Sequence, residues 1–136
     1  MSLEDPIRTF LDSQIVGVLA TRSASGSFHQ SLVYYGRDAD RLFISTETQR
    51  RKARDVRETG WASLCVMGHE RPFPSVTVAG PAFVETDDIG VRTAALAQRM
   101  LGLEEAPEPQ TDEALAGVRR VLIVIEAEHV GPSSYI

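Results

Sequence analysis

The sequence has few of the features that secreted and membrane proteins need. It contains a single cysteine, Cys65, which excludes an internal disulfide framework. No apolar run approaches the roughly 20 residues of a membrane-spanning helix. The charged residues within positions 1–14 are not typical of a secretion signal. These absences predict a cytoplasmic protein that does not associate with membranes.

Residues typical of metal and nucleophile chemistry are equally sparse. His29, His69 and His129 are far in sequence from one another and from Cys65, so no metal-ligand spacing exists. The glycines form no phosphate loop, and no G-x-S-x-G motif occurs. Cys65 stands among apolar neighbours in a β-type run, so we expect a buried, inert thiol. No acid–base cluster is apparent, and the sequence assigns no catalytic residue.

Positive charge is scarce overall but concentrated in one segment. The formal net charge of −5 argues against nonspecific affinity for nucleic acid or for an anionic membrane. Five of the 14 basic residues nevertheless fall within eight positions, and these are Arg50, Arg51, Lys52, Arg54 and Arg57. An acidic chain with one basic segment predicts a local anionic partner.

Short β-type runs separated by turn residues are what the sequence has in abundance. The expected strands are 15–21, 28–36, 41–46, 61–68, 75–85 and 119–126. Pro81 lies inside one of them, so that strand is expected to bend or to lie at a sheet edge. The pattern predicts a mainly β (α+β) fold, a six-stranded antiparallel β-barrel with short flanking helices. The barrel is closed or nearly closed, in a single domain over residues 1–136.

Helical segments are expected between these strands. The expected helices are 6–13, 49–58 and 88–101, with one further helical turn at 112–117. Asp5 is the expected N-cap of the first helix, and Asp87 or Asp88 that of the third. The second helix is basic and is expected to stop near Gly60. Residues 129–136 are expected to be irregular.

The basic helix is expected to begin just after a strand that ends in hydroxyl residues. Ser45 and Thr46 close the strand, and cationic residues follow in the first turn of the helix. Because a helix N-terminus already carries partial positive charge, cations there are unfavourable unless an anion binds. Free backbone N–H groups, hydroxyls and an arginine fork together suit a phosphate. The alternative is a solvated basic face paired with nearby carboxylates, and the pattern alone favours neither.

The order of these elements resembles the split-barrel flavin-binding superfamily that includes pyridoxamine 5′-phosphate oxidase. Within it, the chain is most similar to the small enzymes that use the deazaflavin coenzyme F-420. The segments that carry the resemblance are 17–21 with 26–33, 42–46 with 52–57, 62–66 with 76–80, and 119–125. They extend over nearly the whole chain, and their order and spacing make the resemblance specific.

The resemblance implies an FMN-binding type of split barrel whose cofactor is F-420 or FMN. The implied cofactor-binding residues are Gln30, Ser31, Leu32 and Val33 at the ring, and Ser45, Thr46, Arg50, Arg51 and Lys52 at the phosphate end. Tyr34 and Tyr35 adjoin the ring site, and strand alternation allows at most one of them to contact it.

The resemblance also implies a homodimer with the cofactor at the subunit interface. Trp61, Met67 and Tyr135 are candidates for the partner residues that close the site. The C-terminal tail after Gly131 contains no basic residue. This absence disfavours the phosphorylated vitamin that the family's oxidase proper takes as its substrate.

Three functions remain open at this point. The first is an oxidoreductase that transfers hydride between F-420 or FMN and a small organic substrate, and the resemblance and the arginine density favour F-420. The second is a non-catalytic flavin-binding or sequestering protein. The third is a nucleic-acid or protein-interaction module that uses the basic helix, and the overall acidity makes it the weakest.

Overall fold

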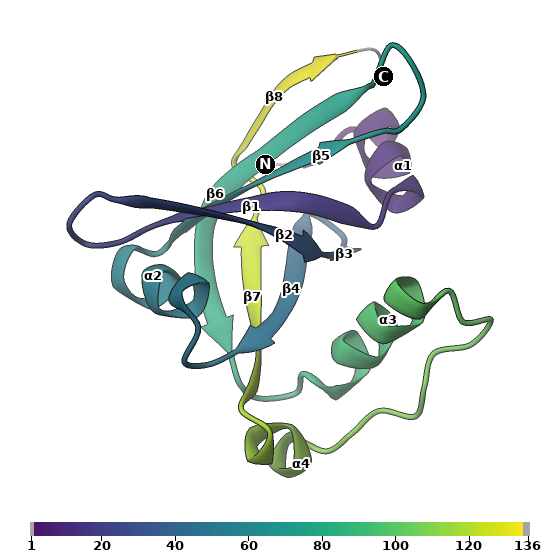
Figure 1. Cartoon of the computed structure of the whole chain (residues 1–136). Coiled ribbons are helices and arrows are strands. Elements are labelled where there is room, and N and C mark those ends of the chain that lie inside the picture. The colour runs from purple at the N-terminus through teal and green to yellow at the C-terminus, as the bar shows by residue number, and fades with distance from the viewer. Residues whose placement is uncertain (1, 135–136) are drawn as a thin grey trace.

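A curled antiparallel sheet dominates the computed structural model, which describes residues 2–134 (Figure 1). Its strands are β1 (Val16–Arg22), β2 (Phe28–Tyr34), β3 (Gly36–Asp38), β4 (Arg41–Glu47), β5 (Trp61–Met67), β6 (Ser75–Glu85), β7 (Arg120–Glu126) and β8 (His129–Ser134). The helices are α1 (Asp5–Ser13), α2 (Arg51–Thr59), α3 (Gly90–Leu101) and α4 (Asp112–Gly117). The predicted α+β split barrel is confirmed.

The strand order explains why the barrel is split. The strands are hydrogen-bonded in the order β2-β1-β5-β6-β7-β4-β3, and β8 pairs with β6 beside this path. Strand β2 therefore lies at one end of the sheet, and β4 lies next to the other end. The two strands approach each other without pairing. The open seam between them is the place where a ligand can enter.

The sheet has eight strands rather than the predicted six. The expected strand 28–36 ends at Tyr34, and Gly36–Asp38 forms a separate short strand against β4. The tail was expected to be irregular, but residues 129–134 pair with β6 as β8. The Gly131-Pro132 pair suggested a loop, yet β6 offers a free edge that this segment covers. Tyr135 lies outside the described residues.

Strand β6 changes partners at Pro81. Residues up to Pro81 pair with β5, and residues from Ala82 onward pair with β7. Because β6 has neighbours on both sides, the change of partner at Pro81 marks a bend and not a sheet edge. A Cβ on the adjacent Gly80 would lie 2.0 Å from the carbonyl oxygen of Glu126. Only glycine lets β6 approach the link between β7 and β8 this closely.

Two hydrophobic clusters hold the helices in place. The larger fills the barrel, where Leu11 of α1 and Val56 of α2 pack with strand residues such as Leu64. The smaller lies outside the sheet and consists of Phe43, Ile89, Leu96, Leu115, Leu122 and Val124. It fixes α3 and α4 against β4 and β7. None of the helices in residues 2–134 has the length and apolar character that a membrane crossing requires.

The helix starts differ from those predicted. Glu4, not Asp5, is the N-cap of α1, and Asp5 lies in its first turn. Helix α3 begins after Ile89, and neither Asp87 nor Asp88 caps it with its side chain. The carboxylate of Asp112 accepts the backbone N–H groups of Asp88 at 2.8 Å and of Ile89 at 3.3 Å. This acceptor comes from α4, so local spacing cannot reveal it. The αL stop of α2 at Gly60 is confirmed.

Candidate functional site

A cavity of about 420 Å³ lies in the seam between β2 and β4, next to α3. Its volume is typical of small-molecule sites. The lining residues are Leu32, Val33, Tyr34, Ser45, Thr46, Glu47, Arg50, Lys52, Thr93, Leu96, Ala97, Met100 and Arg120. They come from β2, β4, α2, α3 and β7. The apolar ones lie on β2 and α3, and most of the polar ones lie on β4, α2 and β7.

One of the polar residues that line the cavity, Thr46, has a buried hydroxyl group without a hydrogen-bond partner among the described residues. Thr46 is only 3% exposed, and its Oγ1 makes no hydrogen bond with any described residue. Buried polar groups in folded proteins are normally paired. Ser45, the N-terminus of α2 and the cations Arg50 and Lys52 stand around the same cavity. This combination of donors is suited to an anion.

Lys52 connects α2, the helix that follows β4, to β2 on the other side of the seam. Its Nζ lies 3.3 Å from Oγ of Ser31, so α2 contacts β2 at this point. Burial of the ammonium group and, secondarily, the nearby charge of Arg50 lower the pKa of Lys52. A partly desolvated cation beside a second cation gains from an anionic ligand, because the ligand offsets both effects.

Glu47 is a carboxylate at the rim of the cationic group. It accepts hydrogen bonds from Gln49 at 2.9 Å and, at longer range, from Arg50, and these bonds lower the pKa of Glu47. The Arg50–Glu47 ion pair spans 3.3 Å, and the Arg50 side chain is 60% exposed. A weak, exposed pair of this kind leaves Arg50 able to turn toward a stronger anion.

Apolar side chains line the opposite part of the cavity. Leu32 and Tyr34 come from β2, and Leu96, Ala97 and Met100 come from α3. Helix α3 therefore forms one wall and β2 the other. A cavity with a cationic end and an apolar end fits an amphipathic ligand that carries a phosphate at one end and a ring system at the other.

Most of the residues predicted to bind a cofactor come together at this cavity. Those that line it are Leu32, Val33, Ser45, Thr46, Arg50 and Lys52, and Ser31 joins them through Lys52. Gln30 is exposed on β2 and lies outside the lining. Arg51 turns away toward the β1–β2 hairpin. Its Nη2 is 3.0 Å from Oγ of Ser27, and its Nε is 3.4 Å from Asp55.

The α3 wall, Glu47 and Arg120 are the parts of the lining that the sequence does not predict. Thr93, Ala97 and Met100 are spaced at helical intervals, and such a stripe looks the same as a core-facing one. Strand alternation does separate the two tyrosines as expected. Tyr34 lines the cavity, whereas Tyr35 is fully buried and donates its hydroxyl to the carbonyl of Leu11.

An exposed apolar surface continues from the cavity along β2 and β5. Phe28, Leu32 and Tyr34 alternate outward on β2, and Leu32 is 76% exposed. Leu32 is paired with Val18 of β1, and Val18 is paired on its other side with Cys65 of β5. Cys65 is exposed, so the prediction of a buried thiol is wrong. Its neighbours Leu64 and Val66 take the inward positions, and Cys65 on the outer face is not covered by the part of the chain that the structure describes.

Within residues 2–134, no group of three or more His, Cys, Asp or Glu side chains is arranged to hold a metal ion.

Trp61 and Met67, the residues predicted to close the site from a partner, lie on β5. Met67 is exposed on the same outer face as Leu32. The side chains of the cavity that can carry a charge are those of Arg50, Lys52, Arg120, Glu47 and Tyr34.

Comparisons with known proteins agree with this geometry. The sequence profile of the pyridoxamine 5′-phosphate oxidase family matches residues 3–132. No curated protein sequence matches the chain. Among solved structures, an F420 reductase has a TM-score of 0.75 at 22% identity, covering 95% of this chain and 98% of its own. A conserved hypothetical protein from Mycobacterium tuberculosis has a TM-score of 0.74 at 22% identity, covering 96% and 83%. HutZ, a heme storage protein from Vibrio cholerae, has a TM-score of 0.68 at 17% identity, covering 98% and 96%.

Proposed function

Because the chain belongs to the pyridoxamine 5′-phosphate oxidase family, we propose that its cavity binds a phosphate-bearing flavin-type cofactor and that the protein is an oxidoreductase. The observation that carries this proposal is the pair of cations Arg50 and Lys52 in the lining of a cavity that also includes Thr46, whose buried Oγ1 has no partner among the described residues. An anionic phosphate oxygen there would accept the hydroxyl proton and offset the charge of both cations. The apolar residues of β2 and α3 would contact the ring.

A bound flavin or deazaflavin supplies hydride transfer to or from a small organic substrate. The residues of the chain bind and orient it. Ser45, Thr46 and the α2 cations would hold the phosphate end, and Leu32 and Met100 would contact the ring. No His or Cys lines the cavity. This fits a reaction in which the main task of the protein is to hold two molecules next to each other.

We favour F-420 over FMN as the cofactor. Helix α2 continues beyond Lys52 with the exposed residues Arg54 and Arg57. Arg57 donates to the carbonyl and hydroxyl of Thr48, which leaves Arg54 on the solvent side of the helix. A cofactor with additional acidic groups beyond its phosphate gains from these charges, whereas FMN has none to offer.

The exposed surface beside the cavity suggests a homodimer. Leu32 belongs both to the cavity wall and to the exposed apolar face of β2 and β5. A second copy of the chain on this face would bury apolar side chains and close the cavity at the same time. The cofactor would then lie at the subunit interface, with Trp61 and Met67 near it.

The first experiment is to purify the protein, record the absorption spectrum and measure the mass of any small molecule that co-purifies. Fluorescence titrations with FMN and F-420 then give two dissociation constants. The double variant Arg50→Ala/Lys52→Ala is expected to lose cofactor affinity by about 100-fold, since two charge-assisted contacts are removed. The control Arg41→Ala/Arg92→Ala removes two cations from surface ion pairs away from the cavity and should bind normally.

Equal affinities for the double variant and the control would contradict the phosphate assignment. Failure of the wild type to bind either cofactor would contradict the whole proposal, as would a bound heme. Binding without reduction or oxidation of any tested substrate would favour the alternative, a non-catalytic flavin-binding or sequestering protein. The absence of His and Cys from the residues that line the cavity is the observation that keeps this alternative open.

A further inference from the structure

The last turn of α3 forms part of the cavity wall without any buried side chain to hold it. Ala97 and Met100 line the cavity, yet no side chain from Ala97 to Leu101 is buried. Leu96, one residue earlier, is the last side chain of α3 in a hydrophobic cluster. A contact other than apolar packing must therefore set the position of this turn.

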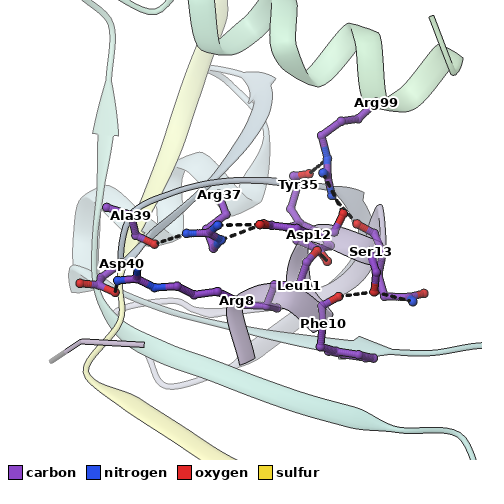
Figure 2. Close-up of polar contacts among 11 residues, drawn as sticks. Arg8, Phe10, Leu11, Asp12, Ser13, Tyr35, Arg37, Ala39, Asp40 and Arg99 are labelled. Atoms are coloured by element: carbon purple, nitrogen blue, oxygen red, sulfur yellow. Dashed lines mark hydrogen bonds and ion pairs between the residues drawn. The ribbon is translucent and has the colours of Figure 1, made fainter. Parts of the chain in front are cut away.

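Arg99 provides that contact. Its Nε donates to the carbonyl oxygen of Tyr35 at 3.0 Å, its Nη1 to that of Asp12 at 3.5 Å, and its Nη2 to that of Gln14. The guanidinium carbon also lies 5.3 Å from the centre of the Tyr35 ring, within cation–π range. Figure 2 shows Arg99 extending from α3 toward the end of α1 and Tyr35.

The groups that accept these bonds form a cross-linked base. The hydroxyl of Tyr35 donates to the carbonyl of Leu11 at 2.5 Å, and the Tyr35 side chain is fully buried. Asp12 accepts two hydrogen bonds from Arg37, at 2.8 Å and 2.6 Å (Figure 2). The base therefore joins α1, the end of β2 and β3. It is a fixed point against which α3 is held.

The position of Tyr35 relates this base to the cavity. Tyr34, the preceding residue, lines the cavity from the β2 side. Met100, the residue after Arg99, lines it from the α3 side. The bond from Arg99 to the Tyr35 carbonyl thus joins two chain segments that face each other across the apolar part of the cavity.

We propose that Arg99 is a positioning residue for the cofactor ring, because it sets the separation of α3 and β2 in the apolar part of the cavity. The identity of the ligand rests on the proposed function, but the positioning of α3 does not. The contacts of Arg99 are with Tyr35, Asp12 and Gln14, and Ser45, Thr46 and the α2 cations are not among them. Loss of Arg99 should therefore weaken binding of the ring and leave the phosphate end intact.

The test compares Arg99→Leu, Arg99→Lys and a control on the same helix, Arg92→Leu. Arg92 pairs with Glu85 at 2.5 Å near the start of α3 and does not line the cavity. Hydrogen exchange of the α3 amides is measured in the ligand-free proteins. Binding of FMN and F-420 is followed by fluorescence, and binding of inorganic phosphate by phosphorus NMR.

For Arg99→Leu we expect faster exchange confined to the last turn of α3. We also expect a rise of about tenfold in the FMN dissociation constant, if the competent cavity is populated about one tenth of the time. Phosphate binding should change by less than about twofold, because the phosphate end does not depend on α3. Arg99→Lys should lie between Arg99→Leu and the wild type, and Arg92→Leu should match the wild type.

Unchanged exchange in Arg99→Leu would overturn the proposal. So would faster exchange throughout the sheet, or an equal loss of phosphate and FMN binding, since Arg99 would then serve general stability. An equal effect of Arg92→Leu would also overturn it. If the wild type binds neither FMN nor F-420, the proposed function fails, while the exchange measurement still decides the role of Arg99.

Discussion

The hydroxyl of Thr21 donates a hydrogen bond of 2.9 Å to the carboxylate of Asp55, and both side chains are buried. The bond joins β1 to α2, the helix that supplies Arg50 and Lys52 to the cavity. Arg51 approaches the same carboxylate at 3.4 Å. The cationic residues of α2 thus stand on a helix that is tied to the sheet by a buried polar contact and not by packing alone.

Thr21→Val should therefore destabilise the fold. The substitution keeps the shape of the side chain but removes one partner of a buried carboxylate, which costs about 1–3 kcal/mol. Urea denaturation measures the change in the free energy of unfolding. Thr86→Val, at an exposed position after β6, is the control and should change it by less than about 0.5 kcal/mol. Equal stability of Thr21→Val and the wild type would refute the importance of this bond.

Thr46→Val should behave in the opposite way. The hydroxyl of Thr46 has no partner to lose among residues 2–134, so the unfolding free energy should stay the same or rise. Cofactor binding should weaken by about 10- to 100-fold, since a hydrogen bond to a charged group contributes about 1.5–3 kcal/mol. Urea denaturation and FMN titration of the same preparation give both quantities. A stability loss as large as that of Thr21→Val would show that Thr46 has a structural partner.

The lowered pKa of Lys52 predicts a pH dependence of cofactor binding. Because burial lowers this pKa from its ordinary value of 10.5, the ammonium loses its charge at a lower pH than an exposed lysine would. Affinity for a phosphate-bearing cofactor should therefore fall as the pH rises toward 10.5, because Lys52 loses its charge before the pH reaches this ordinary value. Lys52→Arg retains its charge throughout this range and should bind with little pH dependence. Identical pH profiles for Lys52→Arg and the wild type would rule out Lys52 as the titrating group.

Burial of Tyr35 raises the pKa of its phenol well above the ordinary range. The unfolded chain ionises this tyrosine above about pH 10, whereas the folded protein keeps it neutral. Its contribution to stability is thus fully present below pH 10 and is lost as the pH rises, by up to about 1.4 kcal/mol per pH unit. Tyr35→Phe should be less stable at pH 8 by about 1–2 kcal/mol, because the Leu11 carbonyl loses its donor.

The difference in stability between the wild type and Tyr35→Phe should shrink between about pH 10 and pH 11, since only the wild type carries this penalty. Urea denaturation at several pH values gives the two curves. Parallel curves would mean that the Tyr35 phenol ionises in the folded protein as readily as in the unfolded chain.

The exposed face of β2 and β5 predicts self-association. Phe28→Glu places a charge on this face at a side chain that is 65% exposed, and it should shift a dimer toward monomers in sedimentation velocity experiments. Val91→Glu is a matched control, because Val91 is 67% exposed but lies on α3. A wild type that sediments as a monomer at all concentrations would contradict the dimer.

The parts of the fold that depend on local pattern could be predicted from the sequence. The strand ending in Ser45 and Thr46 and the basic helix after it are adjacent in the chain, and their chemistry is readable from residue types. The α3 wall could not be predicted, because its contacts are remote in sequence. Arg99 bonds to Tyr35 over 64 positions and to Asp12 over 87. The same reason hides the capping of α3 by Asp112, over 24 positions to Asp88.

Strands β3 and β8 escape prediction for a different reason. Three residues such as Gly36–Asp38 are too few to show an alternating pattern. Residues 129–134 contain Gly131 and Pro132, which are depleted in strands, and β8 forms because β6 offers it a free edge. Cys65 illustrates a related limit, since a strand sequence does not tell whether its outer face is covered.

The unpaired seam between β2 and β4 has a consequence for how this fold can change its ligand. No main-chain ladder fixes the spacing of these two strands, so side chains and α3 alone determine the dimensions of the cavity. Substitutions there can admit a bulkier or a smaller molecule while every strand pair of the sheet is kept. A barrel closed by backbone hydrogen bonds offers no such freedom, and relatives with different ligands can then share one scaffold.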